Sequence, residues 1–338
     1  MVKVRFAPSP TGSLHVGNAL TAVANRRFAN DRGGSFLLRI DDTDPARNVP
    51  GGEEAILCDL AWLGLEWDQG PVRQGERQGR YAEAARTIGR PRLGQITLLR
   101  DDGTATYHLA SVVDDIDYGI THVIRANDHR PNEELHRRLH EALGSTPPEY
   151  IHIGLILGPD GHKLSKRAPL ATLDELRAAG IPPEAVCAYL EELGLPRHDV
   201  HYDEPRIRRL STEAIAAMSD DGLAARAGAP VAVVSALWGS RDLNEAREAA
   251  RAILEPDEVV LPTGSAPTLV RFRELRSRAN GGLDADAARA IVRELKAVGG
   301  NLKALRMALT GRERGPELWA VIAALDRDEA LRRIDAAL

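Results

Sequence analysis

The residues that follow the first apolar stretch of the chain strongly constrain its fold. Residues 5–22, RFAPSPTGSLHVGNALTA, place two prolines and two glycines between a strand-like start and a helical pattern. Pro8 and Pro10 stiffen the backbone and withhold N–H donors. Gly12 permits a tight turn, and Gly17 permits a ligand to approach the backbone closely. The helix that follows directs free N–H groups and the positive end of its dipole toward the turn, an arrangement that suits a phosphate.

This turn by itself leaves two interpretations open. A plain Gly/Pro turn capped by Ser13 accounts for the same residues without any ligand. His15 adds a side-chain donor at the helix start, where a phosphate would bind. The alternatives therefore have to be decided by a second part of the chain.

A second cluster, DGHKLSKRAP at 160–169, follows an apolar strand pattern. Lys163, Lys166 and Arg167 place three cations in five residues, with Ser165 between them. Alone, such a run is usually a solvated loop. Together with the histidine-bearing helix start, it predicts a phosphate clamp with two sides.

The first half of the chain alternates strand and helix patterns. Val2–Phe6, Leu14–Asn30 and Ser35–Ile40 form one strand–helix–strand unit, in which the second strand is almost continuously apolar. The remaining expected strands are Gln95–Leu99, Thr121–Ala126 and Tyr150–Leu157, and the expected helices between them are Gly52–Leu63 and Glu133–Leu143. This alternation predicts an α/β fold with a Rossmann-like parallel sheet.

From Leu173 onward the pattern changes to amphipathic segments rich in Ala, Leu, Glu and Arg. Strand patterns are almost absent there, so the second half is expected to be all-α. The polar stretch Pro196–Pro205 is bracketed by prolines and suits a linker. We therefore expect a nucleotide-binding domain over 1–200 and a helical domain over 201–338.

Length and composition exclude several classes of protein. A chain of 338 residues is expected to form about two domains. No apolar run approaches the length of a membrane span, and Met1–Phe6 does not begin a signal peptide, so we expect a cytoplasmic protein without membrane contact. Cys58 and Cys187 are interpreted as two reduced thiols in the core. The net charge of −5 means that any contact with nucleic acid needs a local basic patch.

The two phosphate-binding stretches, HVGN and KLSKR, resemble the paired nucleotide motifs of class I aminoacyl-tRNA synthetases. In order along the chain, RFAPSPTGSLHVGNA, LLRIDDTDPAR, TYHLASVVDD, GITHVIRANDH and GHKLSKR are similar to the glutamyl-tRNA synthetase series. LRMALTGRERGPEL at 305–318 is similar to the end of the bacterial members. The resemblance thus extends along the whole chain and implies glutamyl-tRNA aminoacylation, a step of protein biosynthesis.

By this resemblance, His15, Lys163 and Lys166 are the catalytic residues, which stabilise charge on the α-phosphate and on the leaving pyrophosphate. Asn18 stands where the motif of the class has a second histidine, and its amide still donates a hydrogen bond. The residues that the resemblance assigns to ATP are Pro8, Gly12, His15, Gly17, Asn18, Lys163, Ser165, Lys166 and Arg167.

The resemblance also assigns residues to glutamate. Arg5 and Arg125 match arginines that face the substrate, and Tyr107 matches an aromatic hydroxyl. Asp41 stands where the family usually has Glu, and Ser111 where it often has Asn, which puts fine substrate specificity in question. The full set implied for glutamate is Arg5, Ala7, Ser9, Asp41, Tyr107, Ser111 and Arg125.

The implied partners are glutamate, ATP, Mg²⁺ and tRNA, and the expected state is a monomer. Magnesium is expected on ATP oxygens and water, so no protein metal site is predicted. Among the acids, Asp44 and Asp115 are open to interpretation as magnesium ligands, as helix caps or as partners of a nearby arginine, and capping is favoured. The basic stretches Arg206–Arg209 and Arg271–Arg278 suit either phosphate contacts or a solvated helix face.

The chain departs from the family pattern at one place. Ordinary members carry a long insertion that holds the acceptor-end binding domain, whereas here only Ala82–Ala105 remains, too short for a separate domain. Three hypotheses therefore stay open: a glutamate–tRNA ligase; a paralogue that transfers activated glutamate to a small amine, a carrier protein or a tRNA base; and a catalytically silent RNA-binding relative. A generic dinucleotide enzyme is disfavoured because no G-x-G-x-x-G follows the first strand.

Overall fold

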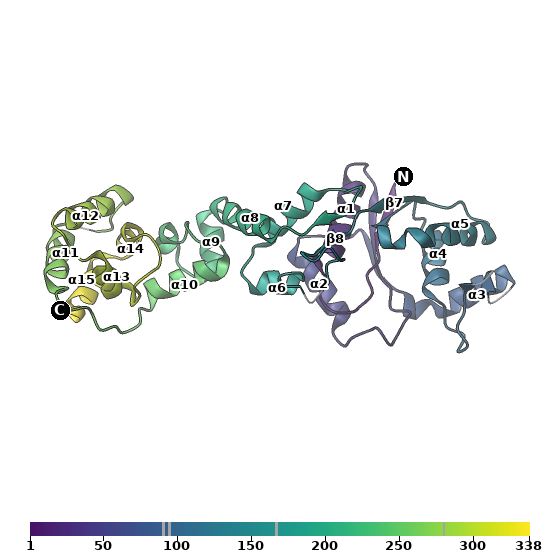
Figure 1. Cartoon of the computed structure of the whole chain (residues 1–338), viewed down its shortest axis with the longest axis horizontal. Helices are drawn as coiled ribbons and strands as arrows, with labels where there is room; N and C mark the ends of the chain where they lie inside the picture. Colours follow the sequence, from purple (N-terminus) through teal and green to yellow (C-terminus); the bar gives the residue numbers. More distant parts are fainter. Residues whose placement is uncertain (90–91, 94–95, 166–167, 280) are drawn as a thin grey trace. The chain divides into compact units, whose positions relative to one another are not determined.

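The computed structural model divides the chain into two compact units (Figure 1). The residues that it describes are 1–89, 92–93, 96–165, 168–279 and 281–338. The first unit comprises Met1–Ala178 and Val186–Glu204, and the second comprises Ala179–Ala185 and Pro205–Leu338. The first is an α/β unit and the second is helical, so the expected fold class is confirmed.

Parallel strands form the centre of the first unit. Strands β1 (Lys3–Phe6), β2 (Ser35–Ile40) and β3 (Gln69–Arg73) pair in that order, and β6 (His122–Ala126) pairs with β7 (Glu149–Ile153). Hydrogen bonds between Lys3 and Thr121 join these sheets at their edges: Thr121 N–H donates to the Lys3 carbonyl over 2.9 Å, and Lys3 N–H donates to Thr121 Oγ1 over 2.8 Å. The strands therefore run β3-β2-β1-β6-β7, and the order reverses between β1 and β6. In such sheets ligands bind beyond the carboxyl ends of the strands at this point of reversal.

Helices and short elements connect these strands. The helices of the first unit are α1 (Val16–Asn30), α2 (Gly52–Trp62), α3 (Gln78–Ile88), α4 (Tyr107–Asp117), α5 (Glu133–Ala142) and α6 (Leu173–Ala178), followed by α7 (Pro183–Leu193). The short elements are the 3₁₀ turns η1 (Gln74–Arg77) and η2 (Asn127–Asn132) and the strands β4 (Arg92–Leu93), β5 (Ile96–Thr97), β8 (Ile156–Leu157) and β9 (Val200–His201). Parallel β8 and β9 lie beside the loop that carries Lys163.

Several sequence-based expectations for this unit differ from the structure. Strand β3 was not expected, and the single strand expected over Tyr150–Leu157 is divided into β7 and β8. Cys58 is exposed on α2 and not in the core. The stretch 95–99 was expected to be a strand of the parallel sheet, but its described part contains β5, which pairs antiparallel with β4. No helix was expected over 107–117, where the structure has α4. Leu109, Val112 and Val113 of α4 are fully buried in a cluster with α3 and α5, so tertiary packing overrides the weak helix propensity of the paired valines.

The second unit is built from helices around one apolar core. They are α8 (Glu204–Ala216), α9 (Asp220–Ala227), the 3₁₀ turn η3 (Val231–Ala236), α10 (Leu243–Leu254), α11 (Ala266–Arg278), α12 (Ala285–Ala297), α13 (Leu302–Thr310), α14 (Leu318–Ala324) and α15 (Arg327–Ala337). Asp242, Asp284 and Asp326 each accept a hydrogen bond from a backbone N–H at the start of a helix. These caps explain where the amphipathic segments begin.

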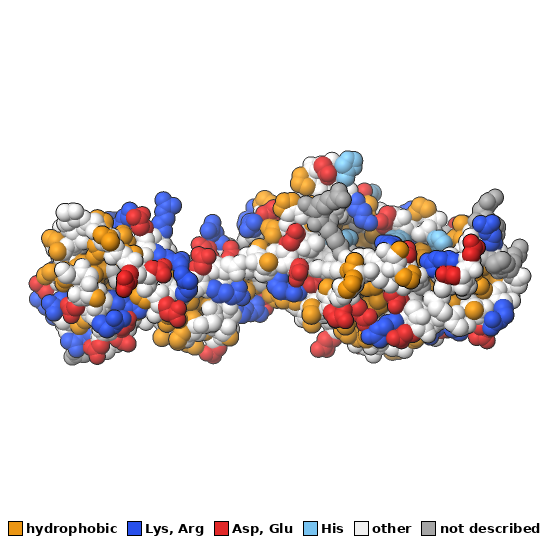
Figure 2. Space-filling view, turned by 90° about the horizontal axis from the view of Figure 1, so that it is seen from below, with side chains coloured by type: hydrophobic (Ala, Val, Ile, Leu, Met, Phe, Trp, Pro, Cys, Tyr) orange, Lys and Arg blue, Asp and Glu red, His pale blue; other side chains and the backbone are white. Residues whose placement is uncertain are grey.

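Several arginines of the two predicted basic stretches serve the fold. Arg276 is fully buried, and its guanidinium donates to the carbonyls of Ala279 and Gly281. Arg271 pairs with Glu274 and Glu294 on the surface. Figure 2 shows basic and acidic side chains interspersed over this unit on the face that it draws. Arg276 therefore fits neither of the two interpretations. The ion pairs of Arg271, and that of Arg206 with Glu213 in the other stretch, fit a solvated helix face.

Within the described residues, no helix is both long and apolar enough to cross a membrane.

Phe272→Ala is expected to destabilise the helical unit strongly. The Phe272 ring on α11 has no exposed surface, and its removal leaves a cavity that lowers the free energy of unfolding by about 3–5 kcal/mol. Val270→Ala on the same helix is the matched control, because its side chain is 43% exposed. Chemical denaturation measures both. Equal losses in the two variants would contradict this account of the core.

Candidate active site

A cavity of about 570 Å³ lies beyond the carboxyl ends of β1 and β6. This volume is typical of a small-molecule site. Twelve of the residues predicted from the sequence line it: Arg5, Ala7, Pro8, Ser9, Gly12, His15, Gly17, Asn18, Asp41, Tyr107, Arg125 and Lys163. The fold thus brings together residues up to 158 positions apart in the chain, from both motifs and from the strands between them.

The remaining predicted residues are placed elsewhere or are outside the described part. Ser111 lies on α4, behind the cavity wall, where its carbonyl oxygen is 3.5 Å from Arg39 Nη1. Ser165 is exposed and does not line the cavity. Lys166 and Arg167 lie outside the residues that the structure describes, so Lys163 is the one predicted cation of the loop whose position is described.

The start of α1 forms one side of the cavity. His15 is the N-cap residue, and its Nδ1 accepts a hydrogen bond from Asn18 N–H over 3.2 Å. A neutral ring that accepts at Nδ1 carries its proton on Nε2, which makes Nε2 a donor. A Cβ on Gly17 would lie 3.0 Å from the His15 ring, and Gly12 has a φ of 92°, so both glycines are needed for this shape.

The loop that carries Lys163 forms the opposite side. Leu164 N–H donates to the Ile156 carbonyl over 2.8 Å, which ties the loop to β8. Lys163 Nζ lies 2.5 Å from Asp128 Oδ2, in the turn η2 after β6. Beyond the loop, Val16 N–H donates to Ala171 O over 2.9 Å, so the chain after the loop returns to the helix start. Both predicted sides of the phosphate clamp therefore line one cavity.

Three buried arginines project from neighbouring strands under the cavity. In register, Arg5 of β1 lies beside Leu37 of β2, and Arg39 lies two residues further along on the same face. Val123 of β6 packs against Leu37, which places Arg125 on this face as well. Burying three guanidinium groups is costly unless anions compensate them. Helix α4 covers this face and supplies part of that compensation.

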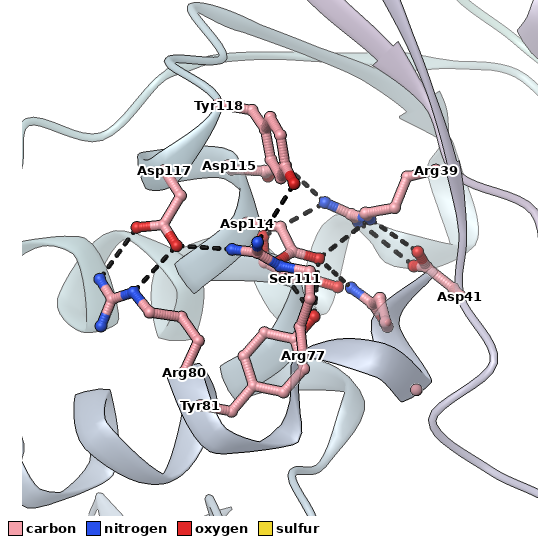
Figure 3. A network of polar contacts seen from close by, with 12 residues as sticks. Arg39, Asp41, Arg77, Arg80, Tyr81, Ser111, Asp114, Asp115, Asp117 and Tyr118 are labelled. Atoms are coloured by element: carbon pink, nitrogen blue, oxygen red, sulfur yellow. Dashed lines mark hydrogen bonds and ion pairs between the residues drawn. The ribbon is translucent and has the colours of Figure 1, made fainter. Parts of the chain in front are cut away.

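Arg39 belongs to a network of buried charged residues that also includes Asp41, Asp114 and Asp115 (Figure 3). It donates to both carboxylate oxygens of Asp41, over 2.7 and 3.2 Å, and to Asp115 over 2.8 Å. Burial lowers the pKa of Arg39, but the two carboxylates more than offset this and hold it well above its usual value. Burial raises the pKa of Asp41 to about 6, even though Arg39 acts to lower it. Asp41 therefore titrates much closer to neutral pH than an ordinary aspartate.

Helix α4 connects this network to the neighbouring helix α3. Asp114 accepts hydrogen bonds from Gln74, Arg77 and Tyr81, and Arg77 also reaches Asp117 (Figure 3). Burial raises the pKa of Tyr81 far above its usual value, so its hydroxyl stays a donor. These bonds hold α4 at a fixed height above the sheet.

The expectation that Asp115 caps a helix is wrong. Asp115 lies near the end of α4, is 2% exposed, and pairs with Arg5 over 3.3 Å and with Arg39 over 2.8 Å. Asp44 accepts from Ala46 N–H over 3.3 Å in a turn that precedes no helix directly. The capping interpretation failed because the sequence pattern did not indicate that α4 is a helix facing two buried arginines.

Arg125 differs from the other two buried arginines because its contacts are uncharged rings. Its Nε lies 3.2 Å from His152 Nε2, and its Nη1 lies 3.5 Å from His136 Nδ1. Its Nη2 is buried and has no hydrogen-bond partner within the part of the chain that is described. Burial lowers the pKa of Arg125, yet an arginine stays charged at neutral pH. A buried cation that lines a cavity without a bonded carboxylate marks a place for an anionic group of a ligand.

Histidines line the same part of the cavity and were not assigned to it from the sequence. His108 Nδ1 lies 3.2 Å from His136 Nε2, and the Tyr107 hydroxyl lies 3.4 Å from His129 Nδ1. Burial, followed by the charge of Arg125, lowers the pKa of His136 well below its usual value, so this ring is neutral. His108 and His129 belong to motifs that the sequence singled out, although neither was assigned to the site, and His136 belongs to none. His108 on α4 and His136 on α5 come together, and near Arg125, only through the packing of the two helices. The described residues contain no group of three or more His, Cys, Asp or Glu side chains that could hold a metal ion.

Comparison with known proteins identifies similar chains. The family model for class I tRNA synthetases (E and Q), catalytic domain, matches residues 1–90 and 86–204, and a model for an anticodon binding domain matches 276–338. A glutamate–tRNA ligase of Rubrobacter xylanophilus is 34% identical over 99% of this chain and 97% of its own length. One from Dinoroseobacter shibae is 31% identical over 99% and 98%. The crystal structure of a glutamate tRNA ligase from Elizabethkingia meningosepticum in complex with its amino acid has a TM-score of 0.79, with 22% identity and 99% coverage of both chains.

These alignments also show that the relatives are longer than this chain. The match to the Rubrobacter protein extends over 422 positions and that to the Dinoroseobacter protein over 464, whereas this chain has 338 residues. The relatives therefore contain stretches that have no counterpart here. The two matches of the catalytic model meet at 86–90, at the end of α3 and before the short β4–β5 hairpin.

Gly17→Ala is expected to weaken ATP binding while leaving the fold intact. The added methyl group displaces the His15 ring from the helix start, and losing one hydrogen bond to a charged phosphate weakens binding about 10- to 100-fold. Gly79→Ala is the matched control, because Gly79 also lies in a helix and its Cβ would meet nothing within 4 Å. Calorimetric titration with ATP measures both. Unchanged affinity in Gly17→Ala would show that the ring does not bind the nucleotide.

Proposed function

The chain belongs to the class I tRNA synthetases for glutamate and glutamine, and we propose that it is a glutamate–tRNA ligase. It activates glutamate with ATP to form glutamyl-adenylate and pyrophosphate, and then transfers the glutamyl group to the 3′ end of tRNA(Glu). Relatives of this name match almost the full length of the chain at 34% and 31% identity, and the anticodon-binding model matches its C-terminal end. The family resemblance expected from the sequence is confirmed.

The state of Arg125 carries this proposal. Arg125 is 5% exposed, lines the cavity, and has an unpartnered Nη2, whereas Arg39 is neutralised by Asp41 and Asp115. A γ-carboxylate placed on Arg125 and Arg5 supplies the missing anion through charge-assisted hydrogen bonds. Glutamate has such a group, whereas glutamine would leave a buried cation uncompensated. This favours glutamate between the two substrates of the family.

ATP is proposed to bind with its triphosphate between the start of α1 and the lysine loop. His15 donates from Nε2 and Lys163 from Nζ toward the triphosphate, and the α-carboxylate of glutamate attacks the α-phosphorus as the bond to pyrophosphate breaks. Positioning and cationic stabilisation are the main requirements of such a transfer. Lys166 follows Lys163 by three positions in the sequence and is proposed to act with it. Mg²⁺ fits as an ion held by phosphate oxygens and water rather than by a protein ligand set.

Asp41 is proposed to bind the α-ammonium group of glutamate. It lines the cavity, and Arg39 fixes both of its oxygens, which positions the carboxylate but also shares its charge. Its carboxylate is a suitable partner only while it is ionised. The raised pKa of about 6 then connects substrate affinity to pH.

One observation favours a different acceptor as the alternative. Between α3 and α4 the described residues form the short hairpin β4–β5, and the two matches of the catalytic model meet at the end of α3. The alignments with the relatives are longer than this chain, and we propose that a stretch is missing here. Activation of glutamate needs only the cavity, whereas transfer to the tRNA 3′ end also needs that end to be guided to the adenylate. The alternative is a glutamate-activating paralogue that transfers to a small amine, a carrier protein or a tRNA base.

Charging assays test the acceptor. We expect radiolabelled glutamate to become attached to total bacterial tRNA in an ATP-dependent reaction, through an alkali-labile ester, and to be lost when the terminal adenosine of the tRNA is removed. Pyrophosphate exchange is measured with and without tRNA in parallel. Exchange without any charging, or charging that survives removal of the adenosine, would overturn transfer to the 3′ end.

Arg125→Gln tests the substrate in the same assays. Removal of the buried cation is expected to lower kcat/KM for glutamate about 100-fold or more, because a charged hydrogen-bonded pair is lost in a buried site. Arg137→Gln is the matched control: Arg125 and Arg137 each lie 5.0 Å from the centre of the Tyr150 ring, but Arg137 pairs with Glu133 and does not line the cavity. Similar losses in both variants would contradict the assignment.

The pH dependence of the KM for glutamate tests Asp41. Because the pKa of Asp41 is raised to about 6, the carboxylate is ionised above that pH and neutral below it. Lowering the pH from about 7.5 to about 5.5 should raise the KM about fourfold, in proportion to the lost ionised fraction. Asp41→Asn should have a high KM that is flat over this range. The same slope in both proteins would assign the titration to another group.

A further inference from the structure

Asp59 on α2 is a buried carboxylate that neither the motifs nor the cavity lining include. It is 1% exposed. Its Oδ2 accepts hydrogen bonds from Leu14 N–H over 2.7 Å and from the Ser13 hydroxyl over 2.8 Å. Its Oδ1 accepts from Arg177 Nη2 over 2.9 Å. A buried charge with three donors from two distant segments is costly to place and fixes both segments when it is satisfied.

The two segments that Asp59 contacts lie next to the two phosphate-binding motifs: one directly precedes HVGN, and the other follows KLSKR. Ser13 and Leu14 form the turn before α1 and line the cavity. Arg177 lies on α6, in the segment after the lysine loop. Asp59 thus lies behind the site and touches each of these segments with a separate oxygen.

Backbone bonds join the same two segments directly. Val16 N–H donates to Ala171 O, and Leu173 N–H donates to Leu14 O, each over 2.9 Å. The Ser13 hydroxyl, which donates to Asp59, also accepts from Asp174 N–H over 3.2 Å. Hydrogen bonds therefore hold the turn before α1 and the chain after the lysine loop together, and the buried carboxylate of Asp59 bonds to both.

We infer that Asp59 is a positioning residue of the nucleotide site, which fixes the distance between the His15 side and the lysine-loop side of the phosphate clamp. It acts through Ser13, Leu14 and Arg177 and does not touch the nucleotide. The residues proposed to hold glutamate are Arg5, Asp41 and Arg125, and none of them is among the hydrogen-bond partners of Asp59. Loss of Asp59 therefore changes the binding of ATP and leaves the binding of glutamate nearly unchanged.

This inference rests on the proposed ATP-dependent activation of glutamate, and the test separates the two. Asp59→Asn keeps the size of the side chain and removes its charge, so one acceptor for Arg177 or for the turn is weakened. We expect the KM for ATP to rise about tenfold and the KM for glutamate to stay within about twofold, since small misplacements of a reacting group cost up to about 100-fold. Calorimetric affinity for ATP alone should fall by the same factor.

Asp68→Asn is the matched control. Asp68 also accepts from a backbone N–H, that of Phe36 over 2.7 Å, and pairs with Arg26 over 2.7 Å, but it lies before β3 and outside the cavity lining. It should lower the melting temperature somewhat and change neither KM. Arg177→Gln removes only the bond to α6 and should raise the KM for ATP by a smaller factor, which keeps the test available if Asp59→Asn does not fold.

The outcomes are distinct. Equal rises in the two KM values, or a loss of thermal stability with an unchanged KM for ATP, would overturn the positioning role. If the unaltered protein shows no glutamate-dependent exchange or charging, the proposed function fails. The calorimetric ATP affinities of Asp59→Asn and Asp68→Asn still decide the role of Asp59 in that case.

Discussion

The burial of three guanidinium groups under one cavity is the constraint on which the first unit depends. Arg5, Arg39 and Arg125 occupy the same face of three adjacent strands, where aliphatic side chains would normally pack. Their charges require anions at fixed positions, and these come from the loop after β2 and from α4. The position of α4, its bonds to α3 and the floor of the cavity all follow from that requirement.

The positive charges of the three arginines are compensated unequally, and least at Arg125. Arg39 has two carboxylates and Arg5 shares one of them, whereas Arg125 has neutral rings. The lowered pKa of His136 follows first from its burial and then from the cation beside it, so the ring cannot add a second charge. The result is a graded site, neutralised beneath β2 and electropositive beneath β6. This gradient is consistent with the proposed placement of the γ-carboxylate of glutamate at Arg125 and of its ammonium group at Asp41.

On the side of the cavity proposed for the nucleotide, backbone hydrogen bonds as well as charges hold the structure together. Hydrogen bonds between the turn before α1 and the chain after the lysine loop join two motifs that are about 150 residues apart. Lys163 is paired with Asp128 in the structure, so the proposed binding of a phosphate would exchange one anionic partner for another. Such an exchange keeps the cost of desolvating the lysine low, because the ion remains paired in both states.

Much of the fold and the cavity lining follows from the sequence. The strand–turn–helix start, the strands β2, β6 and β7 and the helical second half are local patterns, and twelve predicted residues line one cavity. Short stretches of sequence did not indicate that α4 is a helix or that Arg276 is buried. They also did not indicate which partners the buried acids have: Asp115 pairs with Arg5 and Arg39, and Asp59 bonds to Leu14 and Arg177. Hydrophobic periodicity and turn chemistry determine which elements form. Which buried charge meets which partner depends on how distant elements pack, and only the tertiary structure decides that.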